Sequence, residues 1–120
     1  MEDKVNLEHA LGQFSEPWRP RIIAEVNGSK VQVAKFHGDH TWHAHDDSDD
    51  FFLVLKGKMF LDLPDQTLEM GPGDLYVVPA GMKHRPRTEA EAHILNIELM
   101  GTVSTGDADE SVLTAPEQRL

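Results

Sequence analysis

From Arg21 onward the chain alternates short apolar runs with turn-forming residues. The runs have the length of β-strands and lie at residues 22–26, 31–33, 51–55, 59–63, 68–70, 75–78 and 94–100. Between them lie sequences typical of tight turns: Asn27-Gly28, Pro64-Asp65-Gln66, Gly71-Pro72-Gly73 and Pro79-Ala80-Gly81. Asn-Gly between two β-rich runs is a hairpin signal, because both central residues of the favoured turn need a positive φ. Many short strands and short turns predict an all-β sandwich or barrel.

The two ends of the chain depart from this pattern. One short helix is expected over residues 6–14, where the apolar side chains follow helical spacing and Asn6 is an acceptable N-cap. Pro17 and Pro20 are expected to end it. Residues 101–120 begin with small polar side chains and continue with acidic ones, which predicts an extended tail.

Two of the expected strands, residues 51–55 and 75–78, have apolar side chains at odd-numbered and at even-numbered positions alike. Because successive side chains of a strand point to opposite faces, this pattern predicts burial on both faces. Two packed sheets or a contact between subunits would provide it.

Length and composition indicate a single domain over residues 1–120. The formal net charge of -10 disfavours binding to nucleic acid and to anionic membrane surfaces. The chain has no cysteine, which excludes disulfides and thiolate metal sites. The N-terminus lacks the pattern of a signal peptide, and no apolar stretch approaches the ~20 residues of a spanning helix. We therefore expect a soluble, cytoplasmic domain.

Histidines carry the candidate chemistry. His43 and His45 would point to the same face of a strand, and two imidazoles aimed together make half of a metal site. A second element, residues 73–84, consists of a strand and a tight turn that would deliver His84 to the same interior. His-X-His alone is a weak signal, but its combination with this second element is strong.

At this point the sequence resembles the cupin superfamily, in particular its small single-domain members. The first cupin motif is matched by Gly38, His43, His45, Asp50 and Gly57, and the second by Gly73, Pro79, Gly81 and His84. Thr105-Gly106-Asp107 is also similar to an element of those proteins, so the motif-bearing core spans residues 31–107. Three positions depart from the pattern. Gly38 stands five rather than six residues before His43, Asp50 replaces a glutamate, and Thr88 replaces an asparagine.

The resemblance implies an antiparallel, jelly-roll-like cupin β-barrel that binds one divalent metal ion per chain, which is Fe, Mn, Ni, Zn, Cu or Co. The implied ligands are His43, His45, His84 and Asp50. Because aspartate is one methylene shorter than glutamate, three arrangements stay open besides direct ligation by Asp50. Asp50 would bind through a water, Asp49 would take its place, or the site would consist of three histidines. The resemblance also implies a homodimer, with residues 21–26 as an edge or exchanged strand.

Two classes of function follow. The first is an enzyme that acts on a small polar molecule by metal-centred chemistry of the dioxygenase, isomerase or lyase type. The second is a binding protein for a small ligand, or a protein in which the metal only braces the barrel. The fold hosts many reactions, so the sequence identifies neither the substrate nor catalytic residues.

Other residues near the motifs are assigned simpler roles. His37 and His40 are expected at the surface or the rim, and the remaining loop aspartates in solvent. Phe52 is expected to line the pocket together with Val54. Arg85 and Arg87 are expected at the surface, with binding of a substrate carboxylate as the alternative. Trp42 is expected on the outer face of the barrel.

Overall fold

The computed structural model of the protein describes residues 4–120, which form one short helix and seven strands. In chain order the elements are α1 (Leu7–Leu11), β1 (Arg21–Val26), β2 (Ser29–Asp39), β3 (Asp50–Lys56), β4 (Met59–Asp62), β5 (Thr67–Met70), β6 (Leu75–Val78) and β7 (Arg85–Leu99). All the predicted strands are present. The helix has the predicted N-cap, because the Asn6 side chain accepts a hydrogen bond from the His9 amide, but it ends at Leu11 rather than near the prolines.

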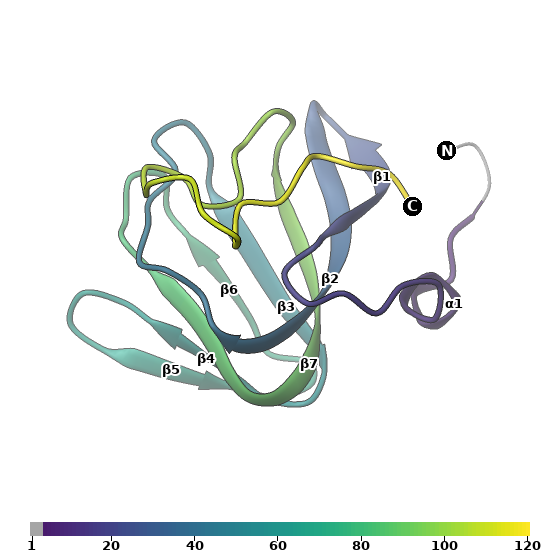
Figure 1. Cartoon of the computed structure of the whole chain (residues 1–120), viewed down its shortest axis with the longest axis horizontal. Coiled ribbons are helices and arrows are strands. Elements are labelled where there is room, and N and C mark those ends of the chain that lie inside the picture. The colour runs from purple at the N-terminus through teal and green to yellow at the C-terminus, as the bar shows by residue number, and fades with distance from the viewer. Residues whose placement is uncertain (1–3) are drawn as a thin grey trace.

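The strands pair antiparallel throughout, which confirms the predicted antiparallel cupin-like β fold. The central strand is β7, which pairs with β2 along most of its length. On its other side β7 pairs first with β4 and then with β3, so it belongs to two leaves. The main leaf has the strand order β1-β2-β7-β3-β6, and the β4–β5 hairpin extends the other leaf (Figure 1).

The β1–β2 hairpin turns at Asn27-Gly28, as the sequence predicts. Both residues have a positive φ, 50° at Asn27 and 76° at Gly28. This is the backbone conformation that makes Asn-Gly favourable in a two-residue hairpin loop.

The inner face of the main leaf is apolar at one end and polar at the other. Phe36, Val54 and Ile94 belong to the main core, which the β4–β5 hairpin covers with residues such as Met59 and Leu61. Further along the same strands, inward positions carry polar side chains that are nonetheless buried: Lys30, Gln32, Asp50, Asn96 and Glu98. The polar end of the barrel is therefore the place where the fold can hold a functional site.

The outer face of the main leaf is covered only in part. Helix α1 packs Ala10 and Leu11 against Ile23 and Val33 in a second core. At the other edge of the leaf, β6 leaves Leu75 57% exposed and Val77 41% exposed. Among the described residues of the single chain, residues 75–78 are therefore buried on one face only, and burial of the other face requires the contact between subunits that the sequence analysis allows.

The C-terminal segment is packed on the barrel rather than extending away as a tail. It crosses the molecule and runs beside β1, where the Leu120 amide donates to the Ile22 carbonyl at 3.1 Å (Figure 1). Within it, Thr105 is 1% exposed and Glu117 pairs with Lys30 at 2.8 Å. The expectation of a tail fails because polar side chains of this segment find buried partners. Within residues 4–120, no helix is long and apolar enough to cross a membrane.

Candidate metal centre

His43 and His45 lie on the connection between β2 and β3, which is irregular rather than a strand. A single antiparallel bridge nevertheless joins His43 to His84. The His43 amide donates to the His84 carbonyl at 3.0 Å, and the His84 amide donates to the His43 carbonyl at 2.8 Å. A further hydrogen bond, from the Gly81 amide to the His45 carbonyl, holds the second loop against the first. The backbone thus brings together the three histidines that the sequence singles out.

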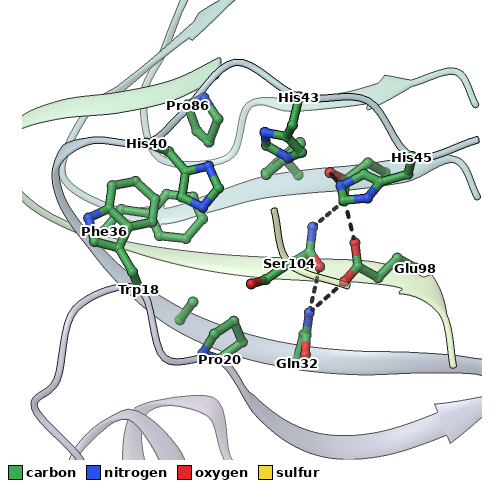
Figure 2. A pocket seen from close by; sticks show the side chains of 14 residues that line it. Trp18, Pro20, Gln32, Phe36, His40, His43, His45, Pro86, Glu98 and Ser104 are labelled. Carbon is green, nitrogen blue, oxygen red and sulfur yellow. Dashed lines mark hydrogen bonds and ion pairs between the residues drawn. The ribbon is translucent and has the colours of Figure 1, made fainter. Parts of the chain in front are cut away.

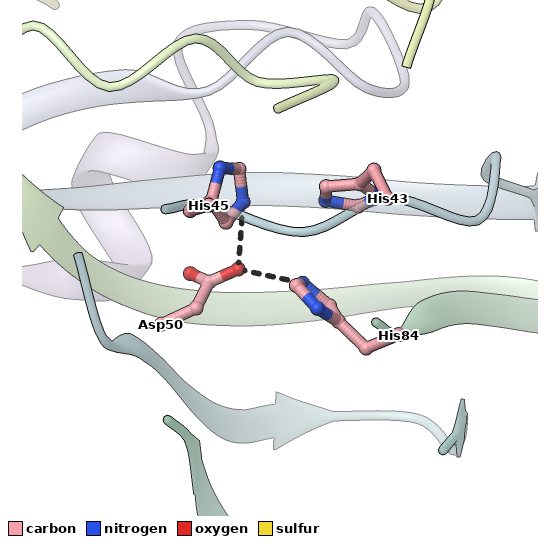
Figure 3. A group of neighbouring side chains, drawn as sticks. All are labelled: His43, His45, Asp50 and His84. Carbon is pink, nitrogen blue, oxygen red and sulfur yellow. Dashed lines mark hydrogen bonds and ion pairs between the residues drawn. The ribbon is translucent and has the colours of Figure 1, made fainter. Parts of the chain in front are cut away.

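Asp50 completes the group from the first position of β3, where its side chain points inward. Its Oδ2 lies 3.0 Å from His84 Nε2 and 3.2 Å from His45 Nε2, and His43 faces the same point (Figure 3). One donor atom from each of the four residues lies within 4.8 Å of the others, and all four side chains are buried. Asp49, by contrast, is exposed and accepts a hydrogen bond from the Ala80 amide, so it does not take the place of Asp50.

Hydrogen bonds outside the cluster fix which nitrogen of the His43 and His84 rings faces it. His43 Nδ1 lies 2.8 Å from the Thr41 carbonyl, and His84 Nδ1 lies 3.0 Å from the Met82 carbonyl. A carbonyl oxygen only accepts, so Nδ1 carries the proton in both rings. When these rings are neutral, their Nε2 lone pairs are therefore directed into the cluster. Second partners that orient metal-binding histidines commonly act in this way.

The charges of the cluster suit a divalent cation. Burial, together with the nearby His84, lowers the pKa of His43 to about 3, so this ring is neutral near pH 7. Burial raises the pKa of Asp50, but hydrogen bonds from His45 and His84 outweigh it and hold the pKa well below its usual range. A neutral His84 would place a lone pair 3.0 Å from a carboxylate oxygen, which is repulsive unless a cation or proton lies between them. Imidazole nitrogens and one carboxylate are a donor set that divalent transition metals accept, and the residues therefore fit a metal.

Asn96 and Gln32 orient Asp50, and the sequence analysis missed both. Asn96 Nδ2 donates to Asp50 Oδ1 at 2.7 Å, which leaves Oδ2 for the histidines. Gln32 Nε2 in turn donates to Asn96 Oδ1 at 2.9 Å. The sequence offers no clear signal, because Asn96 alternates with the apolar Leu95 and Ile97, as a residue facing solvent would.

Glu98 is a second buried carboxyl beside the cluster that the sequence analysis missed. Its Oε2 lies 3.9 Å from His45 Nε2, and its Oε1 lies 3.7 Å from Lys30 Nζ. Burial, with Asp50 close by, raises the pKa of Glu98 well above its usual range. Asp50 is therefore the ionised carboxyl of the site, and Glu98 is the one that holds a proton more readily.

Comparison with known proteins agrees with this geometry. The family model of the cupin domain matches residues 30–98, more than half of the chain, and this span contains all four residues of the cluster. The chain belongs to the cupin family. Protein YdbB of Bacillus subtilis is 38% identical over 99 residues, which are 82% of this chain and 88% of YdbB.

Two solved structures are similar to this cupin in both sequence and fold. A cupin-2 domain protein from Shewanella frigidimarina is 34% identical, with a TM-score of 0.77 over 79% of this chain and 93% of that one. Protein NMB1881 from Neisseria meningitidis is also 34% identical, with a TM-score of 0.74 over 81% of this chain and 99% of that one.

A cavity of about 50 Å³ adjoins the candidate metal centre of this cupin. Trp18, Phe36 and His40 form one wall, and Gln32, Glu98 and Ser104 lie across from them (Figure 2). Phe52 lines the cavity as predicted, whereas Val54 belongs to the apolar core beneath it.

His40 corrects the expectation of a surface or rim residue. Its side chain is buried, and its ring lies between the rings of Trp18 and His43, with centroid distances of 5.0 and 4.8 Å. Burial lowers the pKa of His40 to about 4. Regular strand alternation would point His40 away from His43, but this alternation does not hold because the chain leaves β2 at Asp39.

Arg85 and Arg87 do not reach the cavity. Pro86 between them points inward, and both guanidinium groups lie on the outer face, where they bind Asp62 at 2.9 and 2.8 Å. Arg85 also lies over the ring of Trp42, which is exposed there as predicted. With Asp62 as their partner, the two arginines contribute no positive charge to the cavity.

Proposed function

We propose that this cupin binds one divalent metal ion per chain through His43, His45, His84 and Asp50. The proposal includes metal-centred chemistry of the dioxygenase, isomerase or lyase type on a small molecule. The observation that carries it is the buried convergence of these four donors at the edge of a cavity. A cytoplasmic setting is part of the proposal, since a chain without cysteine is compatible with a reducing compartment.

The lining of the cavity favours a small, uncharged substrate that carries a hydroxyl or carbonyl oxygen. No lysine or arginine lines it among the described residues, so a free carboxylate away from the metal would find no cation. The volume of about 50 Å³ is far below the roughly 300–1,000 Å³ of sites for drug-sized ligands. Small molecules with few heavy atoms therefore fit best.

The side chains around the cavity have distinct roles in this proposal. A bound divalent metal would supply a Lewis acid or a site for O₂. Trp18, Phe36 and Phe52 exclude water, which strengthens electrostatic interactions beside the metal. Nδ1 of His40 lies 3.3 Å from the Thr41 carbonyl, so Nε2 is the nitrogen available to accept a hydrogen bond from a substrate hydroxyl.

A structural role for the metal is the second candidate, and the burial of all four donors favours it. A metal that only braces the barrel would have no position open to an added ligand. Cobalt-loaded protein separates the two candidates. Azide should change its visible spectrum if the metal has an open position, and an unchanged spectrum would favour the structural role.

The metal proposal is tested by metal analysis. Protein purified without added metal, and metal-free protein reloaded with Fe²⁺, Mn²⁺, Ni²⁺, Zn²⁺ or Co²⁺, should contain about one ion per chain. The preferred ion is then used to screen small alcohols, aldehydes and ketones for turnover. Saturable binding without turnover would favour a non-catalytic binding protein.

We also propose that the chain forms a homodimer through the outer face of the main leaf. Cross-strand partners place Val77, Phe51 and Ile97 in one apolar row, and Leu75, Leu53 and Leu95 in a second. A twofold axis would pack these rows against their own copy. Light scattering should give twice the chain mass for the wild type and the monomer mass for Val77→Glu. A monomeric wild type at micromolar concentration would contradict the proposal.

A further inference from the structure

The turn Thr105-Gly106-Asp107 packs directly on the loop that carries His43 and His45. It comes from the C-terminal segment, far from the metal-binding residues in sequence, and contributes no donor atom to the cluster. Thr105 is buried, and its hydroxyl lies 2.9 Å from the Thr114 hydroxyl. The turn is thus anchored on its own segment and presents Asp107 to the histidine loop.

Asp107 contacts both loops that carry histidines. Its Oδ1 accepts a hydrogen bond from the Ala44 amide at 2.7 Å, and its own amide donates to the Ala44 carbonyl at 2.9 Å. Ala44 is the residue between His43 and His45. Oδ2 of the same carboxylate lies 2.8 Å from Nζ of Lys83, which directly precedes His84. One carboxylate therefore connects the two loops.

Gly106 allows this close approach. Its φ is +53°, and a Cβ at this position would lie 2.3 Å from the Ala44 carbonyl oxygen and 3.1 Å from Cδ2 of His43. Any side chain there would displace the histidine loop. The turn is in contact with the backbone and the ring of the metal-binding segment, so its position and theirs are coupled.

We propose that Asp107 is a positioning residue for the metal centre, which holds the His43–His45 loop and the His84 loop at the separation that binding requires. This inference rests on the proposed metal site. Backbone hydrogen bonds join the two loops at His43–His84 and at Gly81–His45, and the Asp107 carboxylate adds a further connection through Ala44 and Lys83. Removing Asp107 frees the Ala44 amide and the Lys83 side chain together. The three histidines then lose more conformational entropy when they bind metal, which weakens the binding.

The test compares Co²⁺ affinity, measured by competition with a chelator, in wild type, Asp107→Ala, Asp107→Asn and Arg19→Ala. Arg19 is the matched control, because it binds the same C-terminal segment through the Thr114 and Val112 carbonyls without touching either histidine loop. Asp107→Ala should bind Co²⁺ about 10-fold more weakly. Asp107→Asn keeps an acceptor for the Ala44 amide, so its Co²⁺ affinity should fall only about threefold. The Co²⁺ affinity of Arg19→Ala should match that of the wild type.

Thermal unfolding of the metal-free proteins separates positioning from overall stability. A wild type that binds no Co²⁺ overturns the proposed metal site and this inference with it. Wild-type affinity in Asp107→Ala, or an equal loss in Arg19→Ala, overturns the positioning role alone. If Asp107→Ala fails to fold, Lys83→Met removes only the exposed ion pair. This substitution should then weaken Co²⁺ binding about threefold. An unchanged affinity overturns the proposal that Asp107 positions the His84 loop through Lys83.

Discussion

Two buried aspartates of this cupin, Asp50 and Asp62, lie at the centres of very different clusters. Asp62, on the outer face, accepts hydrogen bonds from the guanidinium groups of Arg85 and Arg87 and from the Thr67 hydroxyl. Asp50, on the inner face, has Asn96 on one oxygen and two imidazoles on the other. Both carboxyls have a lowered pKa, but only one of them has a permanent cation as its partner.

The difference shows which acidic cluster can take a metal. The arginines stay charged at any ordinary pH and neutralise Asp62 without help. His84 is a partner of Asp50, and His43 belongs to the same cluster. The Nε2 atoms of both rings present lone pairs when the rings are neutral, so the inner cluster has more donors than cations. A buried site of this kind is stabilised by a bound cation, whereas the outer cluster is complete within the protein.

Removing a histidine from the inner cluster should have the largest effect on metal affinity. His84→Ala takes away a donor that contacts Asp50 and is 1% exposed, so we expect metal affinity to fall more than about 100-fold. Metal content after dialysis measures it. Arg87→Ala, at the outer cluster, is the control and should keep the full metal content. Stoichiometric metal in His84→Ala would show that the cluster is not the site.

Loss of the amide that orients Asp50 should have the next largest effect. Asn96→Leu leaves Asp50 Oδ1 without its donor, and metal affinity should fall about 10-fold. Thr67→Val is the matched change at Asp62, since it also removes one hydrogen bond to a buried aspartate. Calorimetric titration with Co²⁺ should show no change for Thr67→Val, and equal losses in the two variants would refute the assigned role of Asn96.

The buried His40 beside the inner cluster should make the metal-free protein sensitive to mild acid. The pKa of His40 is about 4 in the folded chain and 6.5 without burial, so between these values the unfolded state binds a proton that the folded state does not. Lowering the pH through this window therefore destabilises the fold, by at most about 1.4 kcal/mol per pH unit for one histidine. Thermal unfolding in the presence of a chelator should show a shallower pH slope for His40→Gln, and identical slopes would contradict a neutral, buried His40.

The outer cluster should respond to stronger acid only, with the smallest effect. Hydrogen bonds from Arg87, Thr67 and Arg85 outweigh the effect of burial and lower the pKa of Asp62 to about 2. The stabilisation from Asp62 is therefore present above pH 3.8 and is lost as the pH falls through about 2. Asp62→Asn should lower the midpoint of thermal unfolding at neutral pH without changing metal affinity. A loss of metal in this variant would mean that the two clusters are coupled.

Much of the fold was predictable because its signals are local. The Asn27-Gly28 turn determines the first hairpin, and the strands at 51–55 and 75–78 are continuous apolar runs. Strand β7 was predicted too short, since its first part contains the exposed Glu89 and Glu91 and has no apolar run. The packing of the C-terminal segment depends on distant pairs such as Lys30 with Glu117, which no local pattern indicates.

The residues of the candidate site also fall into those that the sequence predicted and those that it did not. His43, His45, Asp50 and His84 were identified because their spacing matches cupin motifs, and the structure brings them together. Asn96, Gln32 and Glu98 were missed, because a polar residue at an inward position looks the same in sequence as one that faces solvent. His40 was misplaced because strand alternation does not extend into an irregular connection.

The most direct measurement is X-ray absorption spectroscopy of the protein loaded with one equivalent of Co²⁺. The account predicts scattering from about three imidazole rings and one carboxylate oxygen at roughly 2.0–2.2 Å. Spectra of His43→Ala and Asp50→Ala should lose an imidazole and a carboxylate contribution, respectively. A wild-type spectrum with only water-like oxygen ligands and no imidazole scattering would contradict the central claim that this cluster is a metal centre.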